Sequence, residues 1–324
     1  MISPPSKPGG PLKTSLRIAA LVSAQSFTLA VVASSVSAQA ATRLERFSVS
    51  ADDGHSLTVW ARHPAARQRG SILLLHGRTW SSLPNFDLHV PHQNASLMDA
   101  LGDAGYAVYA LDQRGYGATP RDSSGWLTPD RAAHDASEVL AWIKKREATR
   151  DHGRAPALFG YSRGSLTALM TAQKYGDGVG ALILYGLPLR PEFYSSLGRD
   201  STAPRRAPTT LDAAGTDFTI PGSPSPEVKA AYQRAAVAAD PVRVDWRDER
   251  EFGALDARAI KVPVLLITGE RDPNVTAADA EFFGHLASVD RQWVVFAAAD
   301  HVAHLERPRD FVYAITAFLS GPRQ

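Results

Sequence analysis

Short runs of consecutive apolar residues recur along most of this chain. A run that is apolar throughout, rather than at every second position, indicates a strand buried on both faces, as in a parallel sheet. Longer stretches between these runs carry apolar residues at helical spacing. The predicted strands span residues 71–75, 106–111, 157–159, 181–185, 262–268 and 292–296, and the predicted helices span 95–104, 130–147, 163–175, 277–287 and 309–319.

This alternation of strands and helices predicts an α/β fold, with a mostly parallel sheet flanked by helices on both faces. The start of the chain differs, because residues 45–63 have the pattern of a β-hairpin around the turn Asp52-Asp53-Gly54. We expect this hairpin to add antiparallel strands at one edge of the sheet.

The alternation stops over residues 188–257, which are rich in Pro, Ser and Thr. This stretch is too long for an ordinary connection. We therefore predict a cap or lid insertion, helical near 227–240, between two parts of one core, residues 41–187 and 258–324. Its aromatic residues either line a substrate cleft or form the small core of the insertion, and we favour the second interpretation for most of them: Phe193, Tyr194, Tyr232, Trp246 and Phe252.

Residues 1–40 resemble neither part of this core. Three basic residues precede a mainly apolar stretch over 18–36, and Ala38-Gln39-Ala40 follows it. This order predicts a secretory signal peptide cleaved after Ala40, and hence a periplasmic or secreted protein. Ser, Gln and Thr residues make the stretch too polar for a good transmembrane anchor, so we expect no stable membrane span after cleavage.

The composition of the chain argues against several classes of function and site. The 324 residues are 44% hydrophobic and 21% charged, with a formal net charge of +2 at pH 7. A charge this small, without a basic cluster, argues against nucleic-acid binding. Cysteine is absent, which excludes disulfides and thiolate metal sites.

The pentapeptide Gly160-Tyr161-Ser162-Arg163-Gly164 stands between a predicted buried strand and a predicted helix. A serine on such a turn presents its hydroxyl to solvent, and the flanking glycines permit a crowded backbone. The pattern alone is a weak signal because Gly and Ser are common. Ser162 is therefore a candidate nucleophile that needs partners.

Two later strand ends supply these partners. His301 is the first imidazole after the strand at 292–296 and is the candidate general base, whereas His304 is the weaker candidate. Asp272 follows the strand at 262–268 and is the candidate orienting acid, with Glu270 as its rival. The order nucleophile, acid, base is far more specific than the pentapeptide.

A tetrahedral intermediate also needs two N–H donors. We expect them from the backbone of Arg163, directly after the nucleophile, and of Arg78, in the loop after the strand at 71–75. The guanidinium groups of the same two arginines either bind a carboxylate of the substrate or pair with surface acids, and we favour the pairing.

Candidate substrate-binding residues are Trp80, His89, Tyr161 and Trp246. The spacing His89-x-x-His92, like His301-x-x-His304, lies in no recognisable zinc signature, so we predict no metal site. A position at the rim of the pocket stays open for His89 and His92.

Taken together, these motifs resemble the α/β-hydrolase superfamily over residues 45–320, except in the insertion. The matching segments are His76-Gly77, Asp112-Gln113-Arg114-Gly115-Tyr116-Gly117, Gly160–Gly164, Gly269-Glu270-Arg271-Asp272 and His301…Glu306-x-Pro308. The resemblance implies an eight-stranded, mostly parallel sheet with a cap after the sixth strand. It also implies Ser162 as nucleophile, His301 as base, Asp272 as acid, and no cofactor. Asp300 and Arg163 depart from the family pattern, where glycine and an apolar residue or Gln are frequent.

The resulting hypothesis is a serine hydrolase that cleaves a small carboxylic ester through an acyl-enzyme. A serine at the elbow separates it from the dehalogenases and epoxide hydrolases of the superfamily, which use Asp. Alternatives are an aminopeptidase or a carbon–carbon bond hydrolase with the same triad, or a non-catalytic binding protein with this fold. The motifs imply no nucleic-acid partner and carry no information on oligomeric state.

Overall fold

The computed structural model describes residues 43–198, 200 and 205–321. The predicted signal peptide, residues 1–40, lies outside this range. Within the described part of the chain, no helix combines the length and the apolar character needed to cross a membrane.

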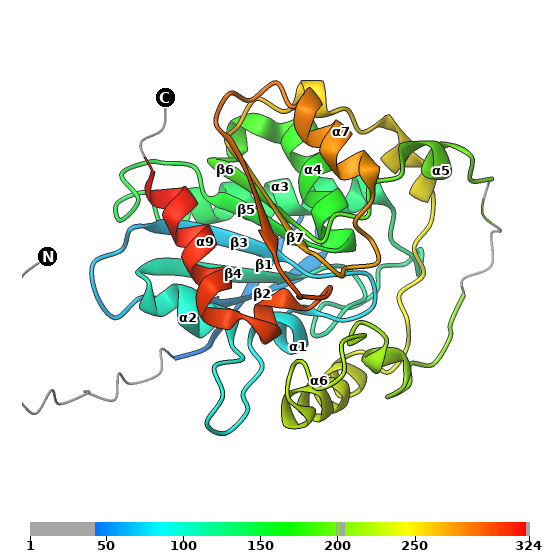
Figure 1. The fold of residues 1–324 in the computed structure, drawn as a ribbon. Helices are drawn as coiled ribbons and strands as arrows, with labels where there is room; N and C mark the ends of the chain where they lie inside the picture. The colour runs from blue at the N-terminus through cyan, green and yellow to red at the C-terminus, as the bar shows by residue number, and fades with distance from the viewer. Residues whose placement is uncertain (1–42, 199, 201–204, 322–324) are drawn as a thin grey trace, which may run out of the picture. The chain divides into compact units, whose positions relative to one another are not determined.

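An eight-stranded sheet organises residues 45–296, with the strand order β1-β2-β4-β3-β5-β6-β7-β8 (Figure 1). The pairs β1–β2 and β2–β4 are antiparallel, and all other pairs are parallel. The predicted fold class and the antiparallel hairpin at the edge are thus confirmed. The strands are β1 Glu45–Ser50, β2 Ser56–Arg62, β3 Gly70–Leu75, β4 Tyr106–Asp112, β5 Ala157–Tyr161, β6 Ala181–Tyr185, β7 Val264–Gly269 and β8 Arg291–Phe296.

Each helix predicted from apolar spacing is present within a few residues of its expected bounds. Short helices of a single turn were not predicted, because one turn has no detectable period. The α-helices are α1 Ser82–Phe86, α2 Leu97–Asp103, α3 Pro129–Arg146, α4 Arg163–Tyr175, α5 Pro191–Ser195, α6 Pro226–Ala239, α7 Ala277–His285, α8 Ala303–Glu306 and α9 Pro308–Ser320, and the 3₁₀ helices are η1 Gly176–Gly178, η2 Ala213–Gly215, η3 Glu249–Ala254 and η4 Ala257–Ala259.

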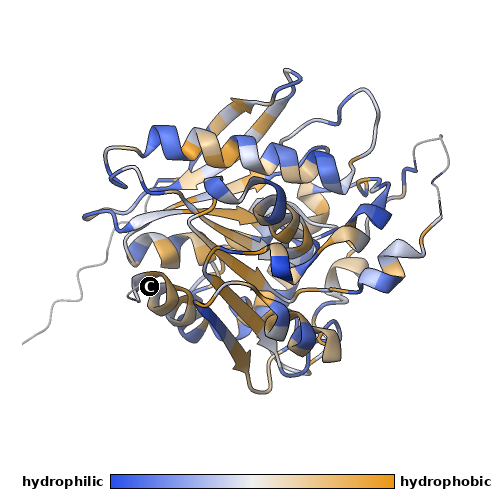
Figure 2. Cartoon of the chain, turned by 90° about the horizontal axis from the view of Figure 1, so that it is seen from above, coloured by the Kyte–Doolittle hydropathy of each residue, from blue (hydrophilic) through white to orange (hydrophobic). Residues whose placement is uncertain are grey.

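Successive side chains of the central strands enter two different apolar layers. Leu73 and Leu75 of β3 join a cluster with α3, α4 and α7, whereas Ile72 and Leu74 join a cluster with α2 and α9. Figure 2 shows mainly hydrophobic strands between helices that carry both hydrophilic and hydrophobic residues. Burial on both faces explains why the runs are continuously apolar.

The insertion between β6 and β7 packs on the rest of the chain through two apolar patches. Trp246 and Phe252 join the layer of α3 and α4, whereas Tyr232 of α6 joins a separate cluster with Trp80 and Val302. Most aromatic residues of the insertion are therefore buried as expected, but in cores shared with the sheet and its loops. Phe193 is the exception and is 54% exposed.

Candidate active site

Ser162 occupies a sharp turn between β5 and α4. Its backbone has φ 53° and ψ −123°, a conformation that a residue other than glycine rarely adopts. A Cβ on Gly160 would collide with the carbonyl of Gly164, and one on Gly164 with the carbonyl of Leu75. The two glycines therefore permit the close approach that creates the turn.

Hydrogen bonds hold this turn in place. The Ser162 N–H donates to the Tyr185 carbonyl at 2.8 Å, and the Ser165 hydroxyl donates to the Ser162 carbonyl at 2.5 Å. The Ser162 hydroxyl itself has no hydrogen-bond partner among the residues that the structure describes. The backbone of Ser162 is thus fixed, whereas its hydroxyl oxygen is held by none of the described residues.

Asp272 and His301 form a close pair at the ends of β7 and β8. The distance from His301 Nδ1 to Asp272 Oδ2 is 2.7 Å, and both side chains are almost fully buried. Asn274, which the sequence analysis did not select, supports the pair, because its N–H donates to Asp272 Oδ1 at 2.8 Å and its amide Nδ2 lies 3.3 Å from His301 Nδ1. Burial lowers the pKa of His301, but the hydrogen bond to Asp272 and its charge outweigh burial, so the net pKa is raised.

The pair lies next to the serine turn. The Tyr161 ring, directly before Ser162, lies 4.9 Å from the His301 ring. Gly186, after β6, packs against both partners, since a Cβ there would lie 2.7 Å from His301 Cε1. Ser162, Gly186, Asp272 and His301 each follow a parallel strand, and the carboxyl ends of such strands meet at one edge of the sheet.

The rival residues of the sequence analysis have other partners. Glu270 accepts a hydrogen bond from the Ala298 N–H at 2.6 Å. His304 is buried, with Nε2 3.1 Å from the Asn85 carbonyl, and burial lowers its pKa to about 3. It is therefore neutral near pH 7 and packs rather than facing solvent.

The loop after β3 approaches Ser162 at Gly77, where a Cβ would lie 3.3 Å from Ser162 Cβ. His76 Nε2 accepts the Gln113 N–H at 3.1 Å, so the proton of the neutral ring is on Nδ1, which donates to the Gly77 carbonyl at 2.9 Å. Burial lowers the pKa of His76 and favours this neutral form. Because C=O and N–H of one peptide are antiparallel, the Arg78 N–H points away from His76.

The N–H groups of Arg78 and Arg163 have no acceptor within the described ranges. Arg163 is the first residue of α4, and the first N–H groups of a helix have no partner inside the helix. Both groups are therefore available to an anionic oxygen next to Ser162. The role of these two N–H groups as oxyanion donors stays a prediction.

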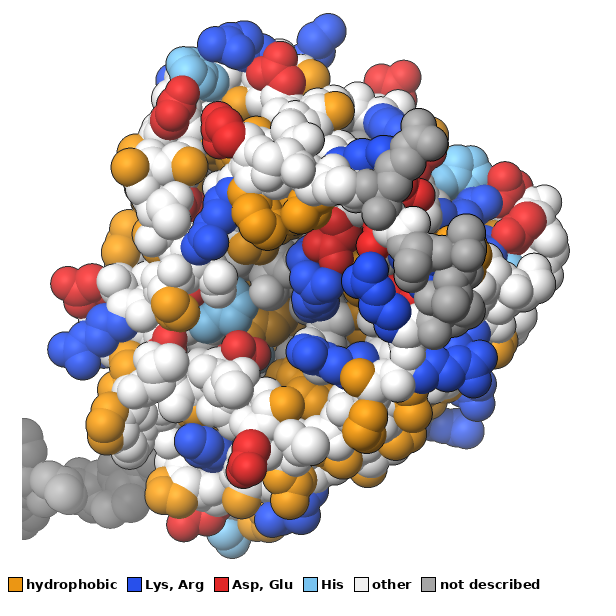
Figure 3. All heavy atoms as spheres, turned by 90° about the vertical axis from the view of Figure 1, so that its right-hand side faces the viewer, with side chains coloured by type: hydrophobic (Ala, Val, Ile, Leu, Met, Phe, Trp, Pro, Cys, Tyr) orange, Lys and Arg blue, Asp and Glu red, His pale blue; other side chains and the backbone are white. Residues whose placement is uncertain are grey.

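The side chains of these two arginines share one carboxylate that the sequence analysis missed. Glu249 Oε1 lies 2.6 Å from Arg78 Nη2, and Glu249 Oε2 lies 2.5 Å from Arg163 Nη1. The acid comes from the insertion and its side chain is only 11% exposed, so it is not the surface acid that we expected. Figure 3 shows Lys and Arg side chains gathered beside a hollow, next to acidic side chains.

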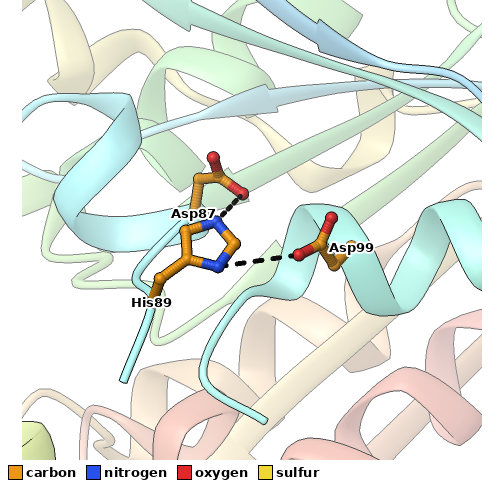
Figure 4. A group of neighbouring side chains, drawn as sticks. All are labelled: Asp87, His89 and Asp99. Carbon is orange, nitrogen blue, oxygen red and sulfur yellow. Dashed lines mark ion pairs between the residues drawn. The ribbon is translucent and has the colours of Figure 1, made fainter. Parts of the chain in front are cut away.

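The candidate substrate residues fall into two groups. Trp80, Tyr161 and Trp246 are buried near this edge of the sheet: Tyr161 stacks on Tyr185, and Trp246 donates to the Tyr116 hydroxyl at 2.7 Å. His89 has a different environment, with Asp87 Oδ1 3.3 Å from its Nε2 and Asp99 Oδ2 3.8 Å from its Nδ1 (Figure 4).

The cluster of Asp87, His89 and Asp99 has the ligand types of a cation site. The guanidinium of Arg62, however, already pairs with Asp87 at 2.9 Å and with Asp99 at 3.0 Å. A metal ion would have to displace a buried cation from both carboxylates. The residues present therefore fit an ion-pair network centred on Arg62.

Comparison with known proteins assigns most of the chain to a family. A family model described as serine aminopeptidase, S33, matches residues 66–308. Among curated proteins, none matches the chain.

Solved structures share the fold at low sequence identity. A monoacylglycerol lipase from Paleococcus ferrophilus is 23% identical, with a TM-score of 0.58 over 81% of this chain and 98% of that chain. An esterase from Pyrococcus furiosus is 17% identical, with a TM-score of 0.55 over 86% of this chain and 90% of that chain. A serine hydrolase involved in carbazole degradation is 19% identical, with a TM-score of 0.57 over 86% of this chain and 99% of that chain.

Proposed function

Because the chain belongs to the serine aminopeptidase S33 family of α/β-hydrolases, we propose that it is a serine hydrolase that cleaves a carboxylic ester through an acyl-enzyme on Ser162. The observation that carries the proposal is the 2.7 Å contact between His301 Nδ1 and Asp272 Oδ2 beside a serine held at φ 53°. An esterase and a monoacylglycerol lipase among the structures of the same fold support an ester by analogy.

The proposed reaction follows from the position of each group. Ser162 Oγ attacks the acyl carbon while His301 Nε2 takes the hydroxyl proton, and Asp272 holds the imidazole through Nδ1. The N–H groups of Arg78 and Arg163 stabilise the oxyanion. His301 then protonates the leaving alkoxide. In the second half, His301 deprotonates a water molecule, which attacks the acyl-enzyme. The bond from the acyl carbon to Ser162 Oγ then breaks, His301 returns the proton to Ser162 Oγ, and the acid is released.

Covalent labelling tests the nucleophile. A fluorophosphonate probe should label the full chain and should fail to label Ser162→Ala. Ser137→Ala is the matched control, because the Ser137 hydroxyl bonds only the His134 carbonyl on α3. Labelling that persists in Ser162→Ala, in a protein that remains folded, would refute the proposal.

Aminopeptidase activity is the second candidate, and the description of the matching family favours it. Asp217 of the insertion adds an observation. Burial raises its pKa, whereas the nearby His301 lowers it, and its carboxylate has no hydrogen-bond or ion-pair partner in the described part of the chain. A substrate ammonium group would fit such an acid. Aminoacyl p-nitroanilides compared with p-nitrophenyl esters separate the two candidates. A higher kcat/KM on the anilides, lost in Asp217→Asn, would favour the aminopeptidase.

We also propose that the insertion caps the site and that residues 1–40 direct export. N-terminal sequencing of the protein recovered from the periplasm or the medium should then begin at Ala41. A mature protein that retains the apolar stretch over 18–36 would contradict export by a cleaved signal.

A further inference from the structure

Glu249 connects the two sides of the proposed oxyanion hole. Its two oxygens are divided between two arginines, with Oε1 2.6 Å from Arg78 Nη2 and Oε2 2.5 Å from Arg163 Nη1. Arg78 follows β3, whereas Arg163 begins α4. One side chain of the insertion thus bridges the two elements from which both N–H donors come.

The spacing of these donors needs such a bridge. Donors of an oxyanion hole act only when both lie at hydrogen-bond distance from one oxygen. Arg78 and Arg163 lie in separate elements, and their like-charged guanidinium groups repel each other. Partial burial and the neighbouring Arg163 lower the pKa of Arg78, and Glu249 opposes this shift. Without the carboxylate, both repulsion and the lost contacts would favour movement of the two arginine side chains away from each other.

Glu249 is itself held by the core. Trp246 forms a β-bridge with Leu127, in the segment that leads into α3, and is 3% exposed. Three residues after Glu249, Phe252 is fully buried. The bridging carboxylate therefore stands on a segment fixed at both ends.

We propose that Glu249 is a positioning residue that sets the distance between the Arg78 and Arg163 N–H donors. The inference rests on the proposed function of Ser162, because it concerns the oxyanion formed there. A carboxylate close to an oxyanion opposes it through charge, so Glu249 assists the reaction through geometry. If the charge of Glu249 dominates, its neutralisation should leave kcat unchanged or raise it. If its geometric role dominates, neutralisation should lower kcat.

The test compares Glu249→Gln with Glu251→Gln in the full chain. Glu251 lies on the same 3₁₀ helix, η3, and bonds α3 rather than either arginine. Turnover of p-nitrophenyl acetate gives kcat and KM. The inhibition constant of phenylboronic acid, which forms a tetrahedral anion on a serine oxygen, reports on the oxyanion hole. Circular dichroism and thermal unfolding confirm that each variant folds.

We expect Glu249→Gln to lower kcat about tenfold with KM nearly unchanged. The inhibition constant of phenylboronic acid should rise by a similar factor. Both effects should be smaller than those of deleting one oxyanion donor. Glu251→Gln should stay within about twofold of wild type. Glu249→Asp keeps the charge but is one carbon too short to reach both arginines, so it should show the same loss. It also replaces Glu249→Gln if that variant does not fold.

Unchanged kcat, or tighter binding of phenylboronic acid, in Glu249→Gln would overturn the inference, because charge would then outweigh geometry. Higher activity of Glu249→Gln on mono-p-nitrophenyl succinate, without lower activity on p-nitrophenyl acetate, would also overturn the inference. Glu249 would then merely occupy a site for a substrate anion. Either result with an inactive Ser162→Ala leaves the proposed function intact. Activity that survives in Ser162→Ala refutes the proposed function instead.

Discussion

The insertion reaches the candidate site at two places, and the two contacts differ in chemistry. Beside the base, Asp300 is fully buried and accepts hydrogen bonds from the Thr219 N–H and hydroxyl, both at 2.5 Å, and from the His301 N–H at 2.7 Å. Beside the oxyanion donors, Glu249 bridges two guanidinium groups, and the Arg78 side chain is 51% exposed. The first contact uses neutral donors away from water, whereas the second uses two ion pairs, of which only the one to Arg78 is reached by solvent.

This difference separates what the two contacts do. Hydrogen bonds to a buried carboxylate are costly to leave unmade, so the contact at Asp300 should govern stability around His301. The ion pair with the half-exposed Arg78 adds little stability and is screened by salt. This pair should therefore matter for the position of the Arg78 N–H group more than for folding.

The largest effect is expected when the base loses its acid while both contacts of the insertion remain. Asp272→Asn should lower kcat about 10⁴-fold, because the imidazole loses its orientation and its tautomer. The same variant should retain the fold of the serine turn. Steady-state kinetics on p-nitrophenyl acetate measure the loss, and a decrease below tenfold would contradict the role of Asp272.

The pH profile of Asp272→Asn tests whether His301 is the general base. Neutral His301 is the active form, so kcat/KM falls as the pH drops through the His301 pKa, which is raised above its usual value. Asp272→Asn removes the largest of the contributions that raise this pKa, leaves the smaller ones from Asp217 and Asp300, and keeps the burial that lowers it. The acid limb should therefore move to lower pH, and a limb that does not move would exclude His301 as the titrating base.

A smaller effect is expected from the contact beside the base. In Asp300→Asn, one of the two accepting oxygens becomes an NH₂ group, which cannot accept a hydrogen bond. Either the Thr219 N–H or the His301 N–H then loses its acceptor. Thermal and urea unfolding should show a loss of about 1–3 kcal/mol in the free energy of unfolding. Asp310→Asn on α9 is the exposed control. Unchanged stability in Asp300→Asn would remove the distinction between the two contacts.

The smallest effect concerns salt. Raising NaCl from 0.05 to 0.5 M should lower kcat on the uncharged acetate ester by about twofold, because salt screens the pair between Glu249 and Arg78. The effect should disappear in Glu249→Gln and persist in Asp300→Asn. An equal salt response in all three proteins would show that the ion pair is not its source.

The sheet could be predicted because its strands are buried on both faces and its helices bury one face. The positions of Ser162, Asp272 and His301 followed from the same pattern, since each comes directly after a strand. The family match confirms the predicted superfamily. The roles of these three residues stay proposals until the variants are measured.

The contacts of the insertion could not be predicted for a physical reason. Glu249 and Thr219 lie in segments without a hydrophobic period, and their partners are 86 and 81 positions away along the chain. The two departures from the family pattern, Asp300 and Arg163, are both contacted by the insertion. Each of these departures could have indicated a contact with the insertion. The residue that makes the contact, however, is identified only in the folded chain. His89, selected as a substrate residue, lies close to Asp87 and Asp99, and its substrate role stays a prediction.

The most direct test of the account is to trap the acyl-enzyme. The full chain is mixed with excess p-nitrophenyl acetate, the p-nitrophenol burst is recorded, and the reaction is quenched with acid for peptide mass spectrometry. The account predicts a burst of about one equivalent per enzyme and an acetyl group on the peptide that contains Ser162, both absent in Ser162→Ala. Turnover with no acylated Ser162, or with the acyl group on another residue, would contradict it.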